Sequence, residues 1–208
     1  MTETRDESQQ GGDLNARNRR ILELAALEAS GETGYQNLTT EAIVTRAGLD
    51  SQAFHRHFAT PSACYASAYA ATVDELVVDL VGSARRPESW VDGMRAALGS
   101  IGRFLEAEPL LARGILLEVY AAGGAAVVKR DEVFERLSRA IDSARRETEP
   151  RHSPPPIAAT LILSMIEAAA SKWLRDDESA PFTEAIPHLL YLAVAFYFGR
   201  EEAERLAG

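Results

Sequence analysis

Residues 38–58 constrain the fold more than any other part of the sequence, because they contain two short helix signals separated by a glycine. Thr39 is a good N-cap for a first helix over residues 40–47, since its hydroxyl can accept a hydrogen bond from a backbone N–H of the first turn. Gly48 ends that helix, and a second helix is predicted over residues 51–58. Two short helices joined around a glycine are the outline of a helix-turn-helix.

The second of these helices has an apolar side and a polar side. Asp50 is placed to cap it, and Phe54 and Phe58, four residues apart, share the face that we expect to be buried. A short helix that is anchored on one side and polar on the other can lie in the major groove of DNA. The DNA contacts are expected from Thr39, Thr40, Arg46, Ser51, Gln52, Ala53, His55, Arg56 and His57.

The charge of the chain restricts how DNA could be bound. The formal net charge is -9, so any affinity for phosphate must come from a local group of cations. Residues 14–60 contain five acidic residues and five arginines that would have to gather on one face: Arg17, Arg19, Arg20, Arg46 and Arg56. Gln52 can pair with an adenine edge, and Arg56 with a guanine edge or a phosphate. His55 and His57 are short donors suited to phosphate oxygens.

The rest of the chain is helical in pattern, and no segment of useful length has strand periodicity, which predicts an all-α fold. Helices are expected over residues 61–81, 88–106, 109–120, 125–147, 157–175 and 187–206, with a proline-containing loop at 148–156. We expect a disordered polar tail (1–13), an N-terminal three-helix DNA-binding domain of the helix-turn-helix type (14–60), and a C-terminal helical ligand-binding and dimerisation bundle (61–208).

Residues 17–60 resemble the DNA-binding domain of the TetR family of transcriptional regulators. The features that carry the resemblance stand here as Arg20-Ile21-Leu22 with Ala25-Ala26, Gly34-Tyr35, Thr39, Ile43 with Ala47-Gly48, and Phe58. Three positions depart from the family pattern, because His55 replaces the usual tyrosine, Pro61 the usual lysine and Val44 the usual alanine. The resemblance implies a repressor that releases a palindromic, double-stranded DNA operator when a small apolar molecule binds the C-terminal domain. An activator is the variant that the sequence leaves open.

The last two helices are candidates for a homodimer interface. One helix-turn-helix reads a single groove, so specific binding normally uses a second copy of the protein. Both helices are rich in apolar residues that must be covered by the domain itself or by a partner. The interface is expected at Ile157, Leu161, Ala168, Leu189, Leu192 and Phe196, and a purely internal bundle is the alternative.

The helices between these two regions could hold a small apolar or aromatic ligand. Such sites are mostly apolar with a few polar groups that orient the ligand, a part that Arg113 and Glu118 could take. The candidate residues are Trp90, Met94, Phe104, Arg113, Glu118, Tyr120, Phe134, Met165 and Trp173, for each of which plain core packing is the alternative.

The sequence contains no recognisable catalytic, cofactor or metal motif. Cys64 is the only cysteine, so no internal disulfide can form, and it is expected to be a small buried side chain. The absence of an internal disulfide fits a cytoplasmic protein. No apolar run reaches the roughly 18 residues that a membrane span needs. The alternative function is a helical small-molecule-binding or interaction protein that does not bind DNA, which the neutral N-terminal domain and Pro61 would favour.

Overall fold

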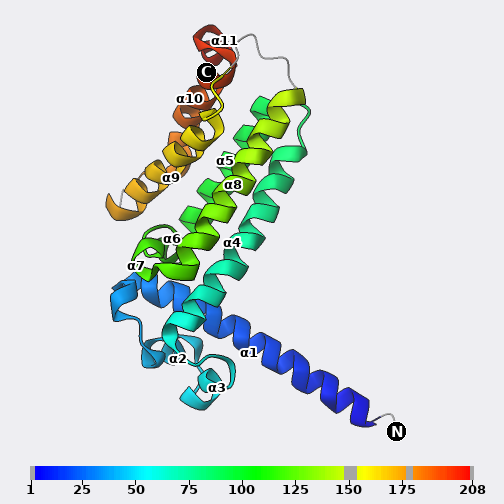
Figure 1. Ribbon diagram of the computed structural model, residues 1–208, viewed down its shortest axis with the longest axis vertical. Coiled ribbons are helices and arrows are strands. Elements are labelled where there is room, and N and C mark those ends of the chain that lie inside the picture. Colours follow the sequence, from blue (N-terminus) through cyan, green and yellow to red (C-terminus); the bar gives the residue numbers. More distant parts are fainter. Residues whose placement is uncertain (1–2, 148–153, 177–179, 207–208) are drawn as a thin grey trace.

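The computed structural model describes residues 3–147, 154–176 and 180–206, and every regular element in these ranges is a helix (Figure 1). The N-terminal elements are α1 (Glu3–Thr33), η1 (Tyr35–Asn37), α2 (Thr40–Ala47) and α3 (Ser51–His57). The bundle contains α4 (Pro61–Arg85), α5 (Trp90–Ala107), α6 (Pro109–Leu116), α7 (Val119–Ala122), α8 (Gly124–Glu147), α9 (Ala158–Asp176), η2 (Phe182–Ala185), α10 (Ile186–Phe198) and α11 (Arg200–Leu206). The all-α prediction is confirmed, and most of the expected proline loop lies outside the described residues.

The first helix starts earlier than the sequence predicted. It begins at Glu3, whereas we expected a disordered tail up to residue 13 and a helix from Leu14. Gly11 and Gly12 each lower helix propensity by about 1 kcal/mol relative to alanine, but neither blocks the backbone hydrogen bonds of a helix. Glycine therefore weakened the helix signal here without marking a helix boundary.

Two of the expected helices are each divided in two. The segment predicted as 109–120 forms α6 and α7, which separate at Leu117 and Glu118. The segment predicted as 187–206 forms α10 and α11, because Gly199 adopts a φ of 86° that does not continue a right-handed helix.

The N-terminal unit has its own apolar core. Phe54 and Phe58 are 0% and 5% exposed, as the sequence predicted. They pack with side chains of α1, α2 and the start of α4, namely Leu22, Ala25, Ala26, Ile43, Val44 and Cys64. Burial, together with the negative charge of Glu23, raises the pKa of the Cys64 thiol to about 12, so this side chain is an inert part of the core.

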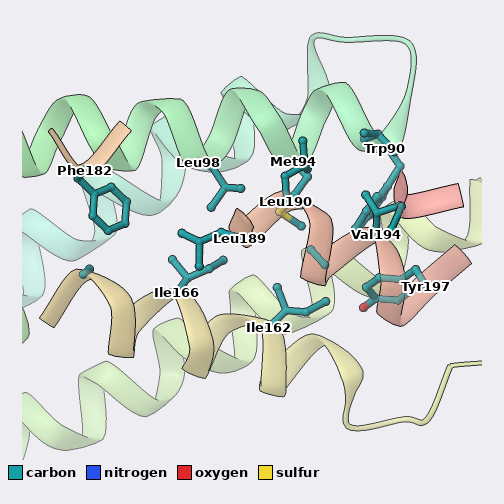
Figure 2. Packing of buried hydrophobic residues seen from close by; sticks show 14 of the residues in the cluster. Trp90, Met94, Leu98, Ile162, Ile166, Phe182, Leu189, Leu190, Val194 and Tyr197 are labelled. Atoms are coloured by element: carbon teal, nitrogen blue, oxygen red, sulfur yellow. The ribbon is translucent and has the colours of Figure 1, made fainter. Parts of the chain in front are cut away.

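A larger core joins α5, α9 and α10 (Figure 2). Figure 2 shows Met94 and Leu98 of α5 facing Ile162 and Ile166 of α9, with α10 between them. The ring of Trp90 contacts that of Tyr197 at a centroid distance of 4.9 Å. These contacts connect the two C-terminal helices to the rest of the bundle.

The N-terminal unit is attached to the bundle by a close crossing of α1 and α6. A Cβ atom on Gly31 would lie 2.0 Å from the carbonyl oxygen of Leu110, and one on Gly114 would lie 2.1 Å from that of Leu27. Side chains longer than hydrogen are thus excluded at both positions, and the two backbones are in direct contact.

Two hydrogen bonds reinforce this junction. The Tyr65 hydroxyl of α4 donates to the carbonyl oxygen of Gly114 at 2.7 Å. The Glu118 carboxylate, between α6 and α7, accepts from the backbone N–H of Tyr35 at 2.7 Å. The orientation of the N-terminal unit is therefore set by both α4 and α6.

Candidate DNA-binding surface and ligand cavity

The two short helices are capped as the sequence predicted. The Thr39 hydroxyl accepts from the backbone N–H of Ala42 at 3.1 Å, and the Asp50 carboxylate accepts from that of Ala53 at 2.7 Å. Gly48, with a φ of 64°, makes the left-handed turn that ends α2. The Asp50 cap thus determines where α3 begins, and the turn at Gly48 determines how α3 is oriented relative to α2.

Substitution of Asp50 by alanine should lower the free energy of unfolding by about 1 kcal/mol, because an N–H at the start of α3 loses its acceptor. Operator affinity should fall as well, since the first turn of α3 carries residues of the exposed face. Chemical denaturation and DNA titration measure the two effects. Asp50→Ser, which keeps a capping oxygen, is the control and should stay close to wild type in both.

One side of α3 is open to solvent. Ser51, Gln52, His55 and Arg56 are all exposed, and Arg56 makes no ion pair with any residue that the structure describes. Thr39 at the start of α2 is also exposed, whereas Thr40 is half-buried. These side chains carry donors and acceptors suited to base edges and phosphates.

Two residues that we expected on this face are turned toward the protein. Ala53 is 3% exposed and belongs to the core side of α3, so its side chain cannot reach a groove. His57 is half-buried, and its Nε2 atom is buried without a hydrogen-bond partner among the described residues. The four-residue spacing of Phe54 and Phe58 identified the exposed face correctly but not its edges.

The expected cluster of arginines is mostly neutralised within the protein. Arg19 pairs with Glu23, Arg20 with Glu75, and Arg46 with Glu28 and Glu32. Arg19 also lies over the ring of Phe58, with its Cζ atom 4.8 Å from the centroid. Arg17 and Arg56 remain exposed, so the cationic footprint for DNA is small.

A cavity of about 510 Å³ lies between the C-terminal half of α4, the N-terminal half of α5, and parts of α8 and α9. Its lining is formed by Leu80, Val81, Ala84, Arg85, Pro87, Glu88, Ser89, Trp90, Gly93, Met94, Ala97, Leu98, Ile101, Leu137, Ala140, Ile141, Leu163 and Ile166. A hollow of about 560 Å³ between α1 and α2 contains the Arg46 ion pair and lacks large apolar side chains. The first cavity is therefore the one suited to an apolar molecule.

Only Trp90 and Met94 of the expected pocket residues line this cavity. Phe104 and Met165 pack against the cores, Trp173 donates its indole N–H to the carbonyl oxygen of Ala180, and Phe134 lies under the Arg130 guanidinium. The Glu118 carboxylate accepts a hydrogen bond from the backbone N–H of Tyr35. Arg113 is half-buried on α6, and Tyr120 is 58% exposed. The sequence missed the α4 and α8 residues of the lining, which read as ordinary aliphatic helix faces.

Five of the six residues expected at a dimer interface are exposed on the adjacent helices α9 and α10 or, for Ile157, in the turn directly before α9. Ile157 and Leu161 are 54% and 42% exposed, and Leu192 and Phe196 are 43% and 39% exposed. Ala168 is exposed on the same helix as Leu161. Leu189 is 5% exposed and packs into the core, so it does not belong to this surface.

The described residues contain neither a candidate membrane span nor a candidate metal site. None of the helices that the structure describes is long and apolar enough to cross a membrane. Within the same ranges no three metal-ligating side chains lie close enough together to hold an ion.

The capped helix pair, the three-helix core and the exposed side of α3 define a helix-turn-helix DNA-binding protein with an all-helical second domain. Residues 22–67 match the family described as bacterial regulatory proteins, tetR family. These residues form a DNA-binding domain of the TetR-family type, and the chain is a DNA-binding transcriptional regulator.

Solved structures share the fold at low sequence identity. The fatty acid degradation regulator FadR from Bacillus halodurans has a TM-score of 0.76 and 15% identity, over 85% of this chain and 94% of that one. FadR from Bacillus subtilis, in complex with stearoyl-CoA, has a TM-score of 0.73 and 16% identity, over 85% and 97%. SmeT, the repressor of the Stenotrophomonas maltophilia multidrug efflux pump SmeDEF, has a TM-score of 0.65 and 20% identity, over 86% and 89%. No curated protein matches the sequence.

Proposed function

We propose that the chain is a ligand-responsive repressor that binds a palindromic operator as a homodimer and releases it when a small apolar molecule fills the cavity. The observation that carries the proposal is the combination, in one chain, of an exposed α3 and an apolar cavity of about 510 Å³. The neighbours support it, since FadR of Bacillus subtilis is seen with stearoyl-CoA and the repressor SmeT with triclosan.

In the proposed complex, α3 lies in the major groove of each half-site. Gln52 and Arg56 read base edges, while Ser51 and His55 contact the flanking bases or phosphates. Thr39 and the first backbone N–H groups of α2 hold a phosphate.

Helix α4 connects the two sites. Its first turns contribute Cys64 to the core of the N-terminal unit, and its last turns contribute Leu80, Val81 and Ala84 to the cavity. A ligand that separates α4 from α5 would tilt α4 and change the spacing of the two copies of α3 in the dimer. The ligand would thereby favour the conformation that does not fit successive grooves.

The exposed apolar residues Ile157, Leu161, Leu192 and Phe196, together with Ala168, form the proposed dimer surface. Four of these side chains are large, apolar and exposed on α10, on α9 or directly before α9, and grouped exposed apolar side chains are a mark of interaction sites. A second copy of the chain would cover it around a two-fold axis, which would give a four-helix interface.

Replacing Leu192 by lysine should convert the dimer into a monomer, because a charge would be buried in the centre of that surface. Light scattering measures the mass, and operator titration should show a loss of tight binding at nanomolar protein. Val78→Lys is the matched control, since Val78 is 65% exposed but lies on α4, outside the surface. A Leu192→Lys protein that stays dimeric would contradict this interface.

The proposal is tested with the DNA that flanks the gene. An inverted repeat in that region should be shifted by the purified protein in a salt-sensitive manner, and apolar compounds that fill the cavity should abolish the shift. Failure to bind any flanking DNA at low salt would overturn the repressor function.

A further inference from the structure

We propose that the ligand of the cavity is an amphipathic anion, with an unbranched apolar tail inside the cavity and an acidic head group held by Arg85 at its mouth. This inference rests on the proposed function, since it names the ligand class of the same cavity. It is carried by the distribution of polar groups along the cavity wall.

The polar side chains of the lining all come from one short segment. Arg85, Glu88 and Ser89 follow one another at the α4–α5 connection, and every other lining residue is apolar or glycine. The cavity is thus apolar over most of its length and polar at one end. An apolar lining does not hold ordered water, so a tail rather than solvent is the favourable content.

Among the three polar side chains, Arg85 is the one placed to bind a head group. The Ser89 hydroxyl is used in the α5 cap, where it accepts from the backbone N–H of Asp92 at 3.0 Å and donates to its carboxylate at 2.6 Å. Arg85 is exposed and has no ion pair with any described residue. A guanidinium is weakly hydrated and binds carboxylates through two parallel hydrogen bonds, which suits a partly buried site.

The carboxylates near the mouth leave Arg85 available for an anion. Residues 85–92 contain Arg85 and Arg86 together with Glu88 and Asp92, and the Asp92 carboxylate already accepts a hydrogen bond from the Ser89 hydroxyl. A cationic ligand held by Glu88 is the opposite assignment and is one outcome of the test below.

The geometry of this end is rigid. A Cβ atom on Gly93 would lie 2.4 Å from the carbonyl oxygen of Ala84, so α4 and α5 are in backbone contact one helical turn from the mouth. Trp90 is 8% exposed and contacts the rings of Tyr197 and Phe198, with centroid distances of 4.9 and 5.5 Å. The head group therefore meets a preformed site beside an indole ring.

The volume limits the length of the tail. A cavity of about 510 Å³ corresponds to about 17 water volumes of 30 Å³. A methylene group occupies about as much space as one water molecule, so a chain of about ten carbons with a compact head group fits this space with room for several more carbons.

The test uses three probes with the same tail: decanoate, 1-decanol and decyltrimethylammonium, each below its micelle concentration. Trp90 and Trp173 are the two tryptophans, and only Trp90 lines the cavity, so a Trp173→Phe protein reports binding through Trp90 fluorescence. Calorimetry on the unmodified protein gives the same affinities if this variant folds poorly. Decanoate should bind about tenfold more tightly than 1-decanol, because only its carboxylate can make a charge-assisted bidentate contact with the Arg85 guanidinium.

Arg85→Gln should remove that tenfold difference, because it should lower the affinity for decanoate and leave that for 1-decanol unchanged. Arg86→Gln, at the neighbouring exposed position, is the control and should leave the difference in place. Ala97→Phe, which fills the apolar part of the cavity, should abolish binding of both probes. Equal affinities for decanoate and 1-decanol, tighter binding of the ammonium probe, or an equal effect of Arg86→Gln would overturn the head-group assignment while leaving the cavity as a ligand site. Absence of binding by every probe would overturn both the head-group assignment and the cavity as a ligand site. Operator binding is measured without any of the three probes, so DNA binding is tested separately.

Discussion

A protein in which Gln52 and Arg56 are both alanine should bind its operator at least about a hundredfold more weakly than the unmodified chain. Each bidentate contact with a base edge contributes about 1–3 kcal/mol, and about 1.4 kcal/mol corresponds to a factor of ten. Both side chains are exposed, so the stability of the fold should not change. Fluorescence anisotropy with labelled operator at a fixed salt concentration measures the affinity, and circular dichroism measures the fold.

The matched control replaces the same two residue types elsewhere on the surface. Gln36→Ala with Arg86→Ala alters two exposed positions outside α3 and should leave operator affinity within a factor of about two, as for other surface substitutions. Unchanged affinity in the Gln52 and Arg56 double variant would favour the alternative function, a helical ligand-binding protein that does not use α3 to read DNA.

Replacing Gly114 by alanine should destabilise the protein by about 3 kcal/mol or more, which is the upper range for overpacking a tightly packed interface. The new methyl group would lie 2.1 Å from the carbonyl oxygen of Leu27, which is backbone and cannot rotate away. Helices α1 and α6 would have to separate, and the Tyr65 and Glu118 hydrogen bonds at this junction would weaken with them. Thermal and chemical denaturation measure the loss.

Gly82→Ala is the control for helix propensity. Gly82 lies in α4, and a methyl group added there would meet no other atom within 4 Å, so alanine should stabilise the protein by about 0.4–1 kcal/mol. A Gly114→Ala protein as stable as the Gly82→Ala protein would show that the crossing of α1 and α6 is looser than the structure describes.

The helix-turn-helix could be predicted because its signals are local. The Thr39 and Asp50 caps and the Gly48 turn each act within a few residues, and the spacing of Phe54 and Phe58 defines the buried side of α3. Gly199 carried a similar local signal for the break between α10 and α11, which the strongly apolar run before it concealed.

The electrostatics of the N-terminal unit could not be predicted, because its ion pairs join residues that are distant in the sequence. Arg20 pairs with Glu75 of α4, and Arg46 of α2 pairs with Glu28 of α1. A count of charges in residues 14–60 contains no information on such pairings. Fewer of these arginines are consequently free of ion pairs than the count suggests.

The cavity was the hardest feature to predict from the sequence. Its lining depends on how each helix is rotated against its neighbours, which tertiary packing decides. The aliphatic residues Leu80 of α4 and Leu137 of α8 became wall residues, while aromatic residues such as Phe104 became core. Aromatic content was therefore a poor guide to the position of the site.

The end of α4 that lines the cavity lies at the opposite end of the bundle from α2 and α3 (Figure 1). An effector that binds there would not compete with the double helix for space, so under the proposed function it could bind the protein while the protein is still on its operator. In the proposed mechanism the effector then accelerates dissociation of that ternary complex, and the speed of derepression follows effector concentration rather than the spontaneous lifetime of the protein on DNA.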